Sequence, residues 1–298
     1  MEMRLNKYLA HCGIASRRAA DTLIMQGHVT VNDQVVQEMG YKVQEKDVIK
    51  FKGKPIKPVD KLVYYLLNKP RNVLSTVSDE KGRKTVIDIL SRKVTERVYP
   101  VGRLDRNTSG LILLTNDGEL TKKLSHPSHE VPKVYHVTLD KNLALKDMET
   151  IRSGFTLEDG EIKADSLHFM ENMSKREVQI EVHSGRNRIV RRIFEHFSYE
   201  VVKLDRVYYA GLTKKNLPRG FFRPLTKEEI RMLKHFTEGK KGKGERDKEE
   251  GKAEELTGGR AEGFKGGRTE GRKGRKAEGL KGGKAEGRRG GKAERRKG

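Results

Sequence analysis

The chain has very little cysteine, no tryptophan and no long apolar run. Its 298 residues include a single cysteine, Cys12, which excludes an internal disulfide and a zinc site built from clustered cysteines. One free cysteine is also typical of a reducing compartment. No apolar run approaches the roughly 20 residues that a bilayer-spanning helix needs. The first residues, MEMRLNKYLAHCG, lack the apolar core of a secretory signal. These absences predict a cytoplasmic protein without a membrane anchor.

Motifs for several kinds of chemistry are also missing. No G-K-[ST] sequence follows the glycines around Asp105, so a P-loop is excluded. The nine histidines show neither H-x-x-x-H nor H-E-x-x-H spacing, and no G-x-S-x-G elbow occurs. A glycosidase would need a second carboxylate facing Asp105, but the next along the chain is Asp117. We therefore predict neither a metal nor a cofactor.

Positive charge is what the chain has in excess. Its 64 lysines and arginines against 42 acidic residues give a formal net charge of +22. This is far more than solubility requires, and such a field attracts polyanions. RNA or DNA is therefore a more natural partner than a membrane. The alternative at this point is a basic, soluble protein without a nucleic-acid partner.

The most informative stretch is PVGRLDRNTSGLILLTNDG, residues 100–118. Asp105 lies in it between Arg103 and Arg106, and the apolar residues 111–114 have the length and composition of a buried strand. Nearby arginines lower the pKa of a carboxyl group and keep it ionised, which suits a nucleophile better than an acid. The alternative is a structural turn in which Asp105 is paired with one of the two arginines.

A second basic stretch is GRNRIVRRIFEHF, residues 185–197, whose spacing predicts an amphipathic helix. The polar face of this helix carries Arg188, Arg191, Arg192 and Glu195. Arg192 and Glu195 have the i,i+3 spacing of an ion pair. Arg186 adds to the excess of cations, which favours contact with nucleic acid or with an active site. A solvated helix face is the alternative.

The first 50 residues predict a compact basic module. Helices are expected over residues 4–10 and from Ser16 to Gly27, followed by two short strands around the turn Asn32-Asp33. Arg17 and Arg18 fall in the first turn of the second helix, where the helix dipole disfavours cations. Their placement predicts an external anion such as phosphate, with solvated arginines as the alternative.

The remaining chain predicts an α+β arrangement of domains. Residues 51–62 have the composition of a linker, which places a boundary near Lys57. Strands are expected over 62–70, 133–139 and 176–184, and helices over 85–90, after Asn116 or Asp117, and from Thr226 to Phe236. Basic residues mixed with aromatic ones over 206–223 suit either RNA or a core. From Thr237 onward glycine and charge dominate, which predicts a disordered basic tail. The expected domains are 1–57, 58–236 and 237–298.

Two resemblances attach these patterns to known families. Roughly residues 3–50, which include RLNKYLAHCGIASRRAADTLIMQGHVTVNDQVV, resemble the small RNA-binding domain (alpha-L motif) first recognised in a small-subunit ribosomal protein. Residues 102–120, GRLDRNTSGLILLTNDGEL, are similar to the signature of RsuA/RluB-type bacterial rRNA pseudouridine synthases. That likeness extends from about residue 3 to 236 and includes LNKPRNVLST, Lys133-Val134-Tyr135 and GRNRIVRR.

The resemblance implies a reaction, a fold and roles for particular residues. Members break the bond between uracil and ribose, rotate the base and rejoin it through carbon 5, without metal or cofactor. Asp105 is implied as the essential group, Tyr135 as the ring that stacks on the target uracil and Arg191 as the partner of Asp105. RNA contacts are implied for Arg4, Lys7, Arg17, Arg18, Lys69, Arg103, Arg186, Asn187, Arg188 and Arg192. The implied fold is an extended, mainly antiparallel sheet flanked by helices, with the active cleft across it.

The chain departs from the family pattern at two positions. Asn72 stands where glycine is common, and Ile189 stands where members commonly carry Gln or Glu. The implied function is site-specific pseudouridine formation in ribosomal RNA by a monomer, and the basic tail favours the large subunit. A small-subunit rRNA or tRNA synthase is one alternative. A non-catalytic RNA-binding ribosome-assembly factor is another, although it would not need Asp105, Tyr135 and Arg191 together.

Replacing Arg17 and Arg18 together with alanine is expected to weaken RNA binding and flatten its salt dependence. Each phosphate contact releases about one counterion when the complex forms. Losing two contacts should therefore reduce the magnitude of the slope of log K against log salt by roughly 1 to 2. Titrating an rRNA fragment at several salt concentrations measures this slope. An unchanged slope would mean that the N-terminal module does not contribute to binding.

Overall fold

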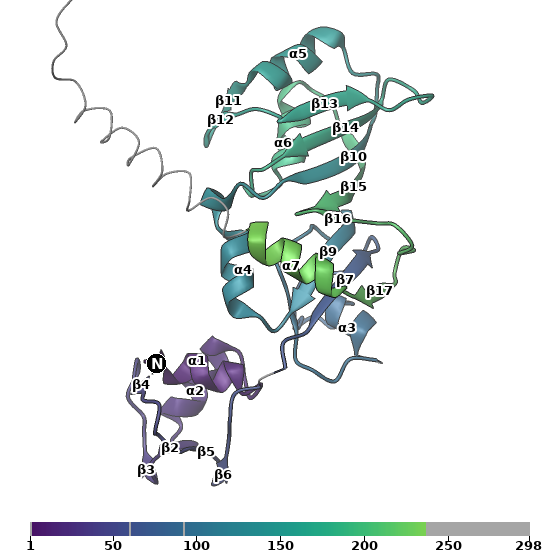
Figure 1. Ribbon diagram of the computed structural model, residues 1–298. Helices are drawn as coiled ribbons and strands as arrows, with labels where there is room; N and C mark the ends of the chain where they lie inside the picture. The colour runs from purple at the N-terminus through teal and green to yellow at the C-terminus, as the bar shows by residue number, and fades with distance from the viewer. Residues whose placement is uncertain (1, 60, 92, 237–298) are drawn as a thin grey trace, which may run out of the picture. The chain divides into compact units, whose positions relative to one another are not determined.

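The computed structural model describes residues 2–59, 61–91 and 93–236, and Figure 1 shows its helices and strands. These residues form two parts. The first is a small N-terminal module of helices and short strands with its own apolar cluster, and the second is built on a nine-stranded sheet with flanking helices. The α+β class is confirmed. The tail expected over residues 237–298 lies outside the described residues.

The N-terminal module follows the predicted pattern of helices and hairpin. Its elements are β1 (Met3–Arg4), α1 (Leu5–His11), α2 (Arg17–Met25), β2 (Val29–Val31), β3 (Gln34–Val35), β4 (Lys42–Val43), β5 (Ile49–Phe51) and β6 (Lys54–Pro55). The Ser16 hydroxyl caps α2 by accepting a bond from the Ala19 amide at 3.2 Å. Asn32 and Asp33 have φ of 51° and 67°, as a tight two-residue hairpin turn requires.

The linker predicted over residues 51–62 starts too early in the chain, because residues 51 and 54–55 belong to strands. Residues 54–55 form β6, which pairs with β5 at the edge of the four-stranded sheet β3-β2-β5-β6. The composition was misleading because proline is tolerated on an edge strand, where its missing N–H leaves no ladder bond unmade. The small module therefore extends at least to Pro55.

The large sheet contains nine of the remaining strands. These are β7 (Tyr64–Lys69), β8 (Tyr99–Pro100), β9 (Ser109–Thr115), β10 (Lys133–Leu139), β13 (Ser166–Phe169), β14 (Glu177–Val182), β15 (Val201–Tyr209), β16 (Leu212–Thr213) and β17 (Phe222–Pro224). Their order is β13-β14-β10-β15-β9-β7-β17, with β16 beside β15 and β8 beside β9. Neighbours are antiparallel except β9 and β15, which are parallel.

Helices and a separate hairpin accompany this sheet (Figure 1). They are α3 (Val86–Leu90), α4 (Gly118–Ser125), the 3-10 turn η1 (Pro127–His129), α5 (Leu145–Ser153), the hairpin β11 (Phe155–Leu157) and β12 (Gly160–Ile162), α6 (Ile189–His196) and α7 (Lys227–Phe236). Side chains cap two of these helices as predicted: Asp117 caps α4, and Thr226 bonds reciprocally with Glu229 on α7. Thr85 and Asp88 form a capping box on α3 that was not predicted.

Strand β9 is buried on both faces, as its apolar run predicts. Ile112 and Leu114 belong to one apolar cluster of the sheet, whereas Leu111 and Leu113 belong to the cluster on its other face. Alternation along a strand sends successive side chains to opposite faces, so only an uninterrupted apolar run satisfies both clusters.

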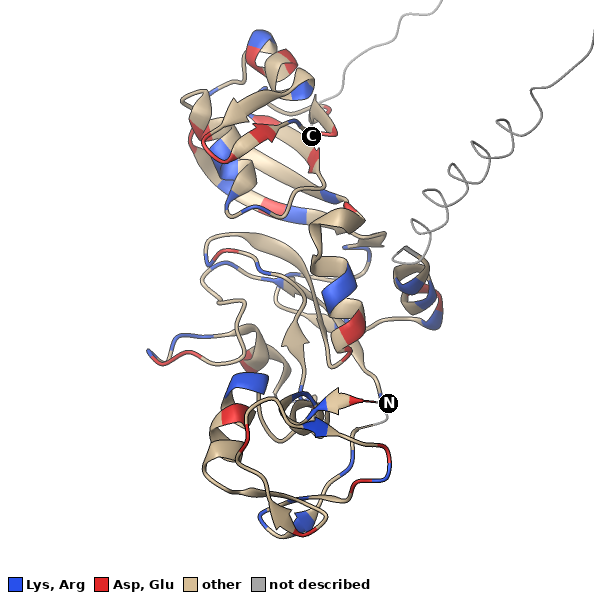
Figure 2. Cartoon of the chain, turned by 90° about the vertical axis from the view of Figure 1, so that its left-hand side faces the viewer, with Lys and Arg blue, Asp and Glu red and all other residues tan. Residues whose placement is uncertain are grey.

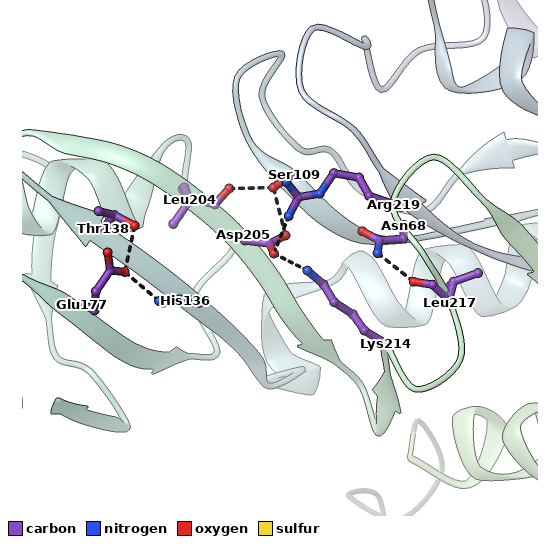
Figure 3. Close-up of polar contacts among 10 residues, drawn as sticks. All are labelled: Asn68, Ser109, His136, Thr138, Glu177, Leu204, Asp205, Lys214, Leu217 and Arg219. Carbon is purple, nitrogen blue, oxygen red and sulfur yellow. Dashed lines mark hydrogen bonds and ion pairs between the residues drawn. The ribbon is translucent and has the colours of Figure 1, made fainter. Parts of the chain in front are cut away.

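The parallel contact between β9 and β15 joins two antiparallel halves of the sheet. It pairs Ser109 with Asp205 and Gly110 with Arg206. Beside it, the Ser109 hydroxyl donates to Asp205 Oδ1 at 2.9 Å, and Lys214 and Arg219 bond the same carboxylate (Figure 3). Lys214 and Arg219, which lie in the basic and aromatic stretch over 206–223, therefore stabilise this junction.

Two elements differ from expectation. Strand β15 was not predicted, although residues 201–209 run through the centre of the sheet. Helix α6 starts at Ile189 rather than at 185, because Arg188 adopts a left-handed conformation with φ of 50°. None of the helices in the described ranges is both long and apolar enough to cross a bilayer.

Gly110→Ala is expected to destabilise the fold strongly. Gly110 has φ of +113°, and a Cβ there would come within 3.0 Å of the Arg206 backbone N, C and O. The strands must separate to admit a methyl group, so the free energy of unfolding should fall by about 3 kcal/mol or more.

Gly82→Ala is the matched control. Gly82 also has positive φ, at +64°, but has no atom within 4 Å of the added Cβ. It should cost only the backbone strain of about 1–2 kcal/mol. Urea unfolding of both variants measures the difference, and equal losses would contradict a packing role for Gly110.

Candidate active site

Asp105 lies in a cleft of about 1030 Å³ at the junction of the two half-sheets. Several segments line the cleft: the loop around Asp105, the end of α4 with η1, β10 with Tyr135, the β11–β12 hairpin, and the turn before α6 with Arg188. Arg206 of the central strand β15 also lines it. The structure thus places two of the three predicted catalytic residues, Asp105 and Tyr135, in one cavity.

The loop that carries Asp105 is held from outside by residues 69–75. The Ser75 hydroxyl donates to the Leu104 carbonyl at 2.9 Å and accepts from the Leu104 amide at 3.2 Å. On the other side of Asp105, the Asn72 amide donates to the Arg106 carbonyl at 2.8 Å. Asn72 has φ of 64°, a left-handed conformation that glycine adopts freely and asparagine tolerates. This explains why asparagine can replace the family's common glycine here.

Lys69 is fully buried, which corrects the prediction that it contacts RNA. Its Nζ donates to the carbonyls of Pro70 and Val73 at 3.1 and 2.8 Å, and it lies 3.5 Å from the Arg106 carbonyl. Burial lowers the pKa of Lys69 to about 8, although the negative charge of Asp105 opposes this shift. Lys69 therefore organises the backbone around Asp105 rather than facing solvent.

Two arginines from the α6 region approach the Asp105 carboxylate. Arg188 Nη1 lies 3.8 Å and Arg191 Nε lies 3.9 Å from Asp105 Oδ2. Arg191 is buried, and its Nη1 donates to the Val201 carbonyl at 2.7 Å. Its Nε has no hydrogen-bond partner among the described residues. The distances describe an ion pair without a hydrogen bond, and such pairs commonly tighten when substrate binds.

The Asp105 carboxylate and the two arginines form a group of opposite charges. Burial lowers the pKa of Arg191, and Arg188 acts in the same direction while Asp105 opposes it. Burying a charge is costly unless a partner of opposite sign accompanies it. Asp105, with 36 % of its side chain exposed, remains accessible to a ligand from the cleft. An accessible carboxylate flanked by cations can act as a nucleophile or as a base.

Tyr135 forms part of the cleft wall through the alternation of β10. Its side chain is buried, and it lines the cleft. His136 and Thr138 point to the other face of the strand, where both bond Glu177 (Figure 3). An aromatic ring with a hydroxyl group at this wall can stack on a base and also exchange a proton.

Arg206 and Lys133 were not predicted as site residues. Arg206 is only 3 % exposed, and its Nε donates to the Leu111 carbonyl at 2.7 Å. Lys133 donates to the carbonyls of Val131 and His183, and burial lowers its pKa to about 8. Arg206 shares a strand face with Leu204, so a strand assigned over 201–209 would have placed this arginine on the buried face.

The other residues with implied RNA contacts are distributed over several surfaces. Arg103 is exposed and lines the cleft, and Asn187 is exposed in the turn before α6. In the N-terminal module Arg4, Arg17 and Arg18 are exposed and Lys7 is half-buried. Lysine and arginine positions are blue in Figure 2. The structure places all of these where a ligand can reach them at least in part.

Arg186 and Arg192 have intramolecular partners. Both bond Asp159 in the turn of the β11–β12 hairpin. The predicted ion pair of Arg192 with Glu195 is wrong, because Glu195 pairs instead with Arg188 at 3.3 Å. Within the described ranges no three His, Cys, Asp or Glu side chains are grouped as a metal ion would need.

Comparisons with known proteins agree with the sequence motifs. A family model described as RNA pseudouridylate synthase matches residues 63–196, and one described as S4 domain matches residues 3–49. The chain is 44 % identical over 235 residues to ribosomal large subunit pseudouridine synthase B of Bacillus subtilis (strain 168), which covers 78 % of this chain and 95 % of that protein. It is 35 % identical over 242 residues to the dual-specificity RNA pseudouridine synthase RluF of Salmonella typhi, covering 79 % and 80 %.

A solved structure supports the same grouping. The crystal structure of a pseudouridylate synthase superposes with a TM-score of 0.56 at 27 % identity. The superposition covers 78 % of this chain and 99 % of that chain.

Lys69→Met is expected to change how stability depends on pH. The pKa of Lys69 is about 8 in the folded chain, against an ordinary value of 10.5. Between these values the unfolded chain keeps a proton that the folded chain has lost, so the contribution of Lys69 to stability rises with pH. Urea unfolding at pH 7 and pH 10 should show the wild type gaining about 2 kcal/mol relative to the variant. A constant difference between the two proteins would contradict a buried, easily deprotonated lysine.

Proposed function

The chain belongs to the RNA pseudouridine synthases that carry an N-terminal S4 domain, and we propose that it converts uridine to pseudouridine at defined positions of large-subunit ribosomal RNA. The observation that supports this most directly is the Asp105 carboxylate, which faces Arg188 and Arg191 in a cleft that Tyr135 also lines. A protein that only bound RNA would not need a carboxylate here, because it repels phosphate.

The chemistry proposed for the site needs no outside reactant. The bond between uracil N1 and ribose C1′ breaks, and a bond between uracil C5 and C1′ forms. The proton lost from C5 is balanced by a proton gained at N1, so no oxidant, metal or leaving group is required. Asp105 acts as the essential carboxylate, with Arg191 and Arg188 beside it as counter-charges. Tyr135 offers its ring to the rotating base and its hydroxyl to the C5 proton.

The target uridine must leave its stack to reach Asp105, as enzymes acting on bases require. A cleft of about 1030 Å³ has room for a nucleotide. Its margin carries the exposed Arg103 and Arg188, which can bind the neighbouring phosphates. Loops and unpaired bases are the RNA elements from which a base is most easily extruded.

The two folded parts have different functions: the first binds RNA and the second catalyses the reaction. Residues 1–57 grip the RNA backbone through Arg4, Arg17 and Arg18, which are exposed on their module. Residues 58–236 carry the cleft and the chemistry. In this proposal the chain acts as a monomer in the cytoplasm: Asp105 and Tyr135 of the same chain line the cleft, and Arg191 lies 3.9 Å from the Asp105 carboxylate. The choice of the large subunit rests on the Bacillus subtilis relative, which is named for that substrate.

Asp105→Asn is expected to abolish pseudouridine formation while leaving RNA affinity within about threefold, because an amide retains the shape but not the nucleophilic charge. Release of tritium from rRNA labelled at uridine C5 measures the reaction. Transcripts of large-subunit and small-subunit rRNA are assayed in parallel, and the wild type should release tritium from the former.

Glu171→Gln is the control, since Glu171 is an exposed carboxylate outside the cleft. It should keep wild-type rates. Full activity of Asp105→Asn would refute the catalytic role of Asp105, and release from small-subunit RNA alone would refute the choice of substrate.

A further inference from the structure

The turn of the β11–β12 hairpin holds two arginines that flank the Asp105 partners in sequence. Asp159 lies in this turn, and its carboxylate binds Arg186 and Arg192. Arg188 and Arg191, which face Asp105, lie between those two positions in the chain. Asp159 itself does not line the cleft and forms no hydrogen bond with Asp105 in the described part of the chain, so the proposed reaction gives it no direct role.

The contact with Arg192 has the geometry of a specific clamp. Arg192 Nη1 bonds Asp159 Oδ2 and Arg192 Nη2 bonds Asp159 Oδ1, both at 2.7 Å. Two parallel bonds fix the direction of the guanidinium plane as well as its distance. Arg192, followed by Arg186, holds the pKa of Asp159 far below its usual range, so the carboxylate stays ionised.

The contacts of Arg186 indicate that it holds the hairpin rather than an RNA phosphate. Arg186 Nη1 bonds Asp159 Oδ1 at 3.2 Å and also the carbonyls of Asp159 and Gly160 at 3.4 and 3.1 Å. Its Nη2 bonds the Glu161 carbonyl. An RNA phosphate could replace the carboxylate, but it could not replace three backbone carbonyls. The Arg186 guanidinium therefore binds the hairpin and is not available to bind a phosphate.

The start of α6 depends on such outside support. In the described structure no side chain caps this helix, and its first turn contains no acidic residue. Its Ncap residue, Arg188, has a left-handed backbone, which is unfavourable for a residue with a Cβ. The hairpin also packs on the other end of α6, where the Phe155 ring lies 4.7 Å from His196 and 5.0 Å from Phe197. The hairpin thus fixes the helix at both ends.

We propose that Asp159 is a positioning residue for the reaction: by clamping Arg186 and Arg192 it fixes the α6 start, and so holds Arg188 and Arg191 against Asp105. The inference rests on the proposed function. A shift of about 1 Å at this distance from the chemistry can cost up to a hundredfold in rate. Asp159 and Arg192 do not line the cleft, so we expect the clamp to influence the chemical step rather than binding.

Asp159→Asn is the test, with tritium release measured as kcat and KM on the rRNA substrate. We expect kcat to fall about tenfold or more, while KM and the salt slope of RNA binding stay within about twofold. Asp159→Glu keeps the charge and both acceptor oxygens and should recover most of the rate. Glu158→Gln is the matched control, because Glu158 carries the same charge one residue away and is exposed.

A second variant covers the case in which Asp159→Asn fails to fold. Arg192→Lys keeps the positive charge but loses the paired bonds, so it should lower kcat by a similar factor. Wild-type kcat in Asp159→Asn or in Arg192→Lys would overturn the inference and leave the proposed function intact. Tighter RNA binding with a steeper salt slope in Asp159→Asn would also overturn it, since Asp159 would then compete with phosphate. Absence of tritium release by the wild type would refute the proposed function, and the inference with it.

Discussion

The contact of two backbones at Gly110 and Arg206 is the constraint on which the rest of the catalytic part depends. It is the one parallel pairing between the antiparallel halves of the large sheet as described, and it leaves no room for a Cβ at Gly110. The loop carrying Asp105 ends at this junction, and the cleft opens beside it. The Asp105 loop is therefore anchored where apolar clusters pack on both faces of the sheet, and such close packing resists small displacements.

Buried cations surround that junction, and most of them are held by backbone carbonyls. Lys69, Lys133 and Arg206 each donate to carbonyl groups near the cleft, and burial lowers the pKa of both lysines to about 8. Such charges are costly in a folded chain unless something compensates them. Asp105 compensates part of the charge, and a polyanionic substrate would compensate more. The site is therefore electrostatically suited to RNA before any RNA binds.

The arginines of the α6 region illustrate how one motif can divide into several roles. Arg188 and Arg191 approach Asp105, whereas Arg186 and Arg192 hold the β11–β12 hairpin. Residues that are adjacent in sequence point in different directions because the helix begins only at Ile189 and turns by about 100° per residue. Charge density alone would have assigned all four to RNA. Their partners decide which of them reach a ligand.

Sequence alone determined much of the local structure of this protein and singled out Asp105 as its candidate catalytic residue. Periodicity predicted β9 and β10, side-chain caps predicted the starts of α2, α4 and α7, and the motif around Asp105 indicated the family. These features depend on residues close together in the chain. The burial of Lys69, the central place of β15 and the clamp at Asp159 were decided only by the tertiary structure. Each depends on contacts between distant segments, whose geometry no local pattern encodes.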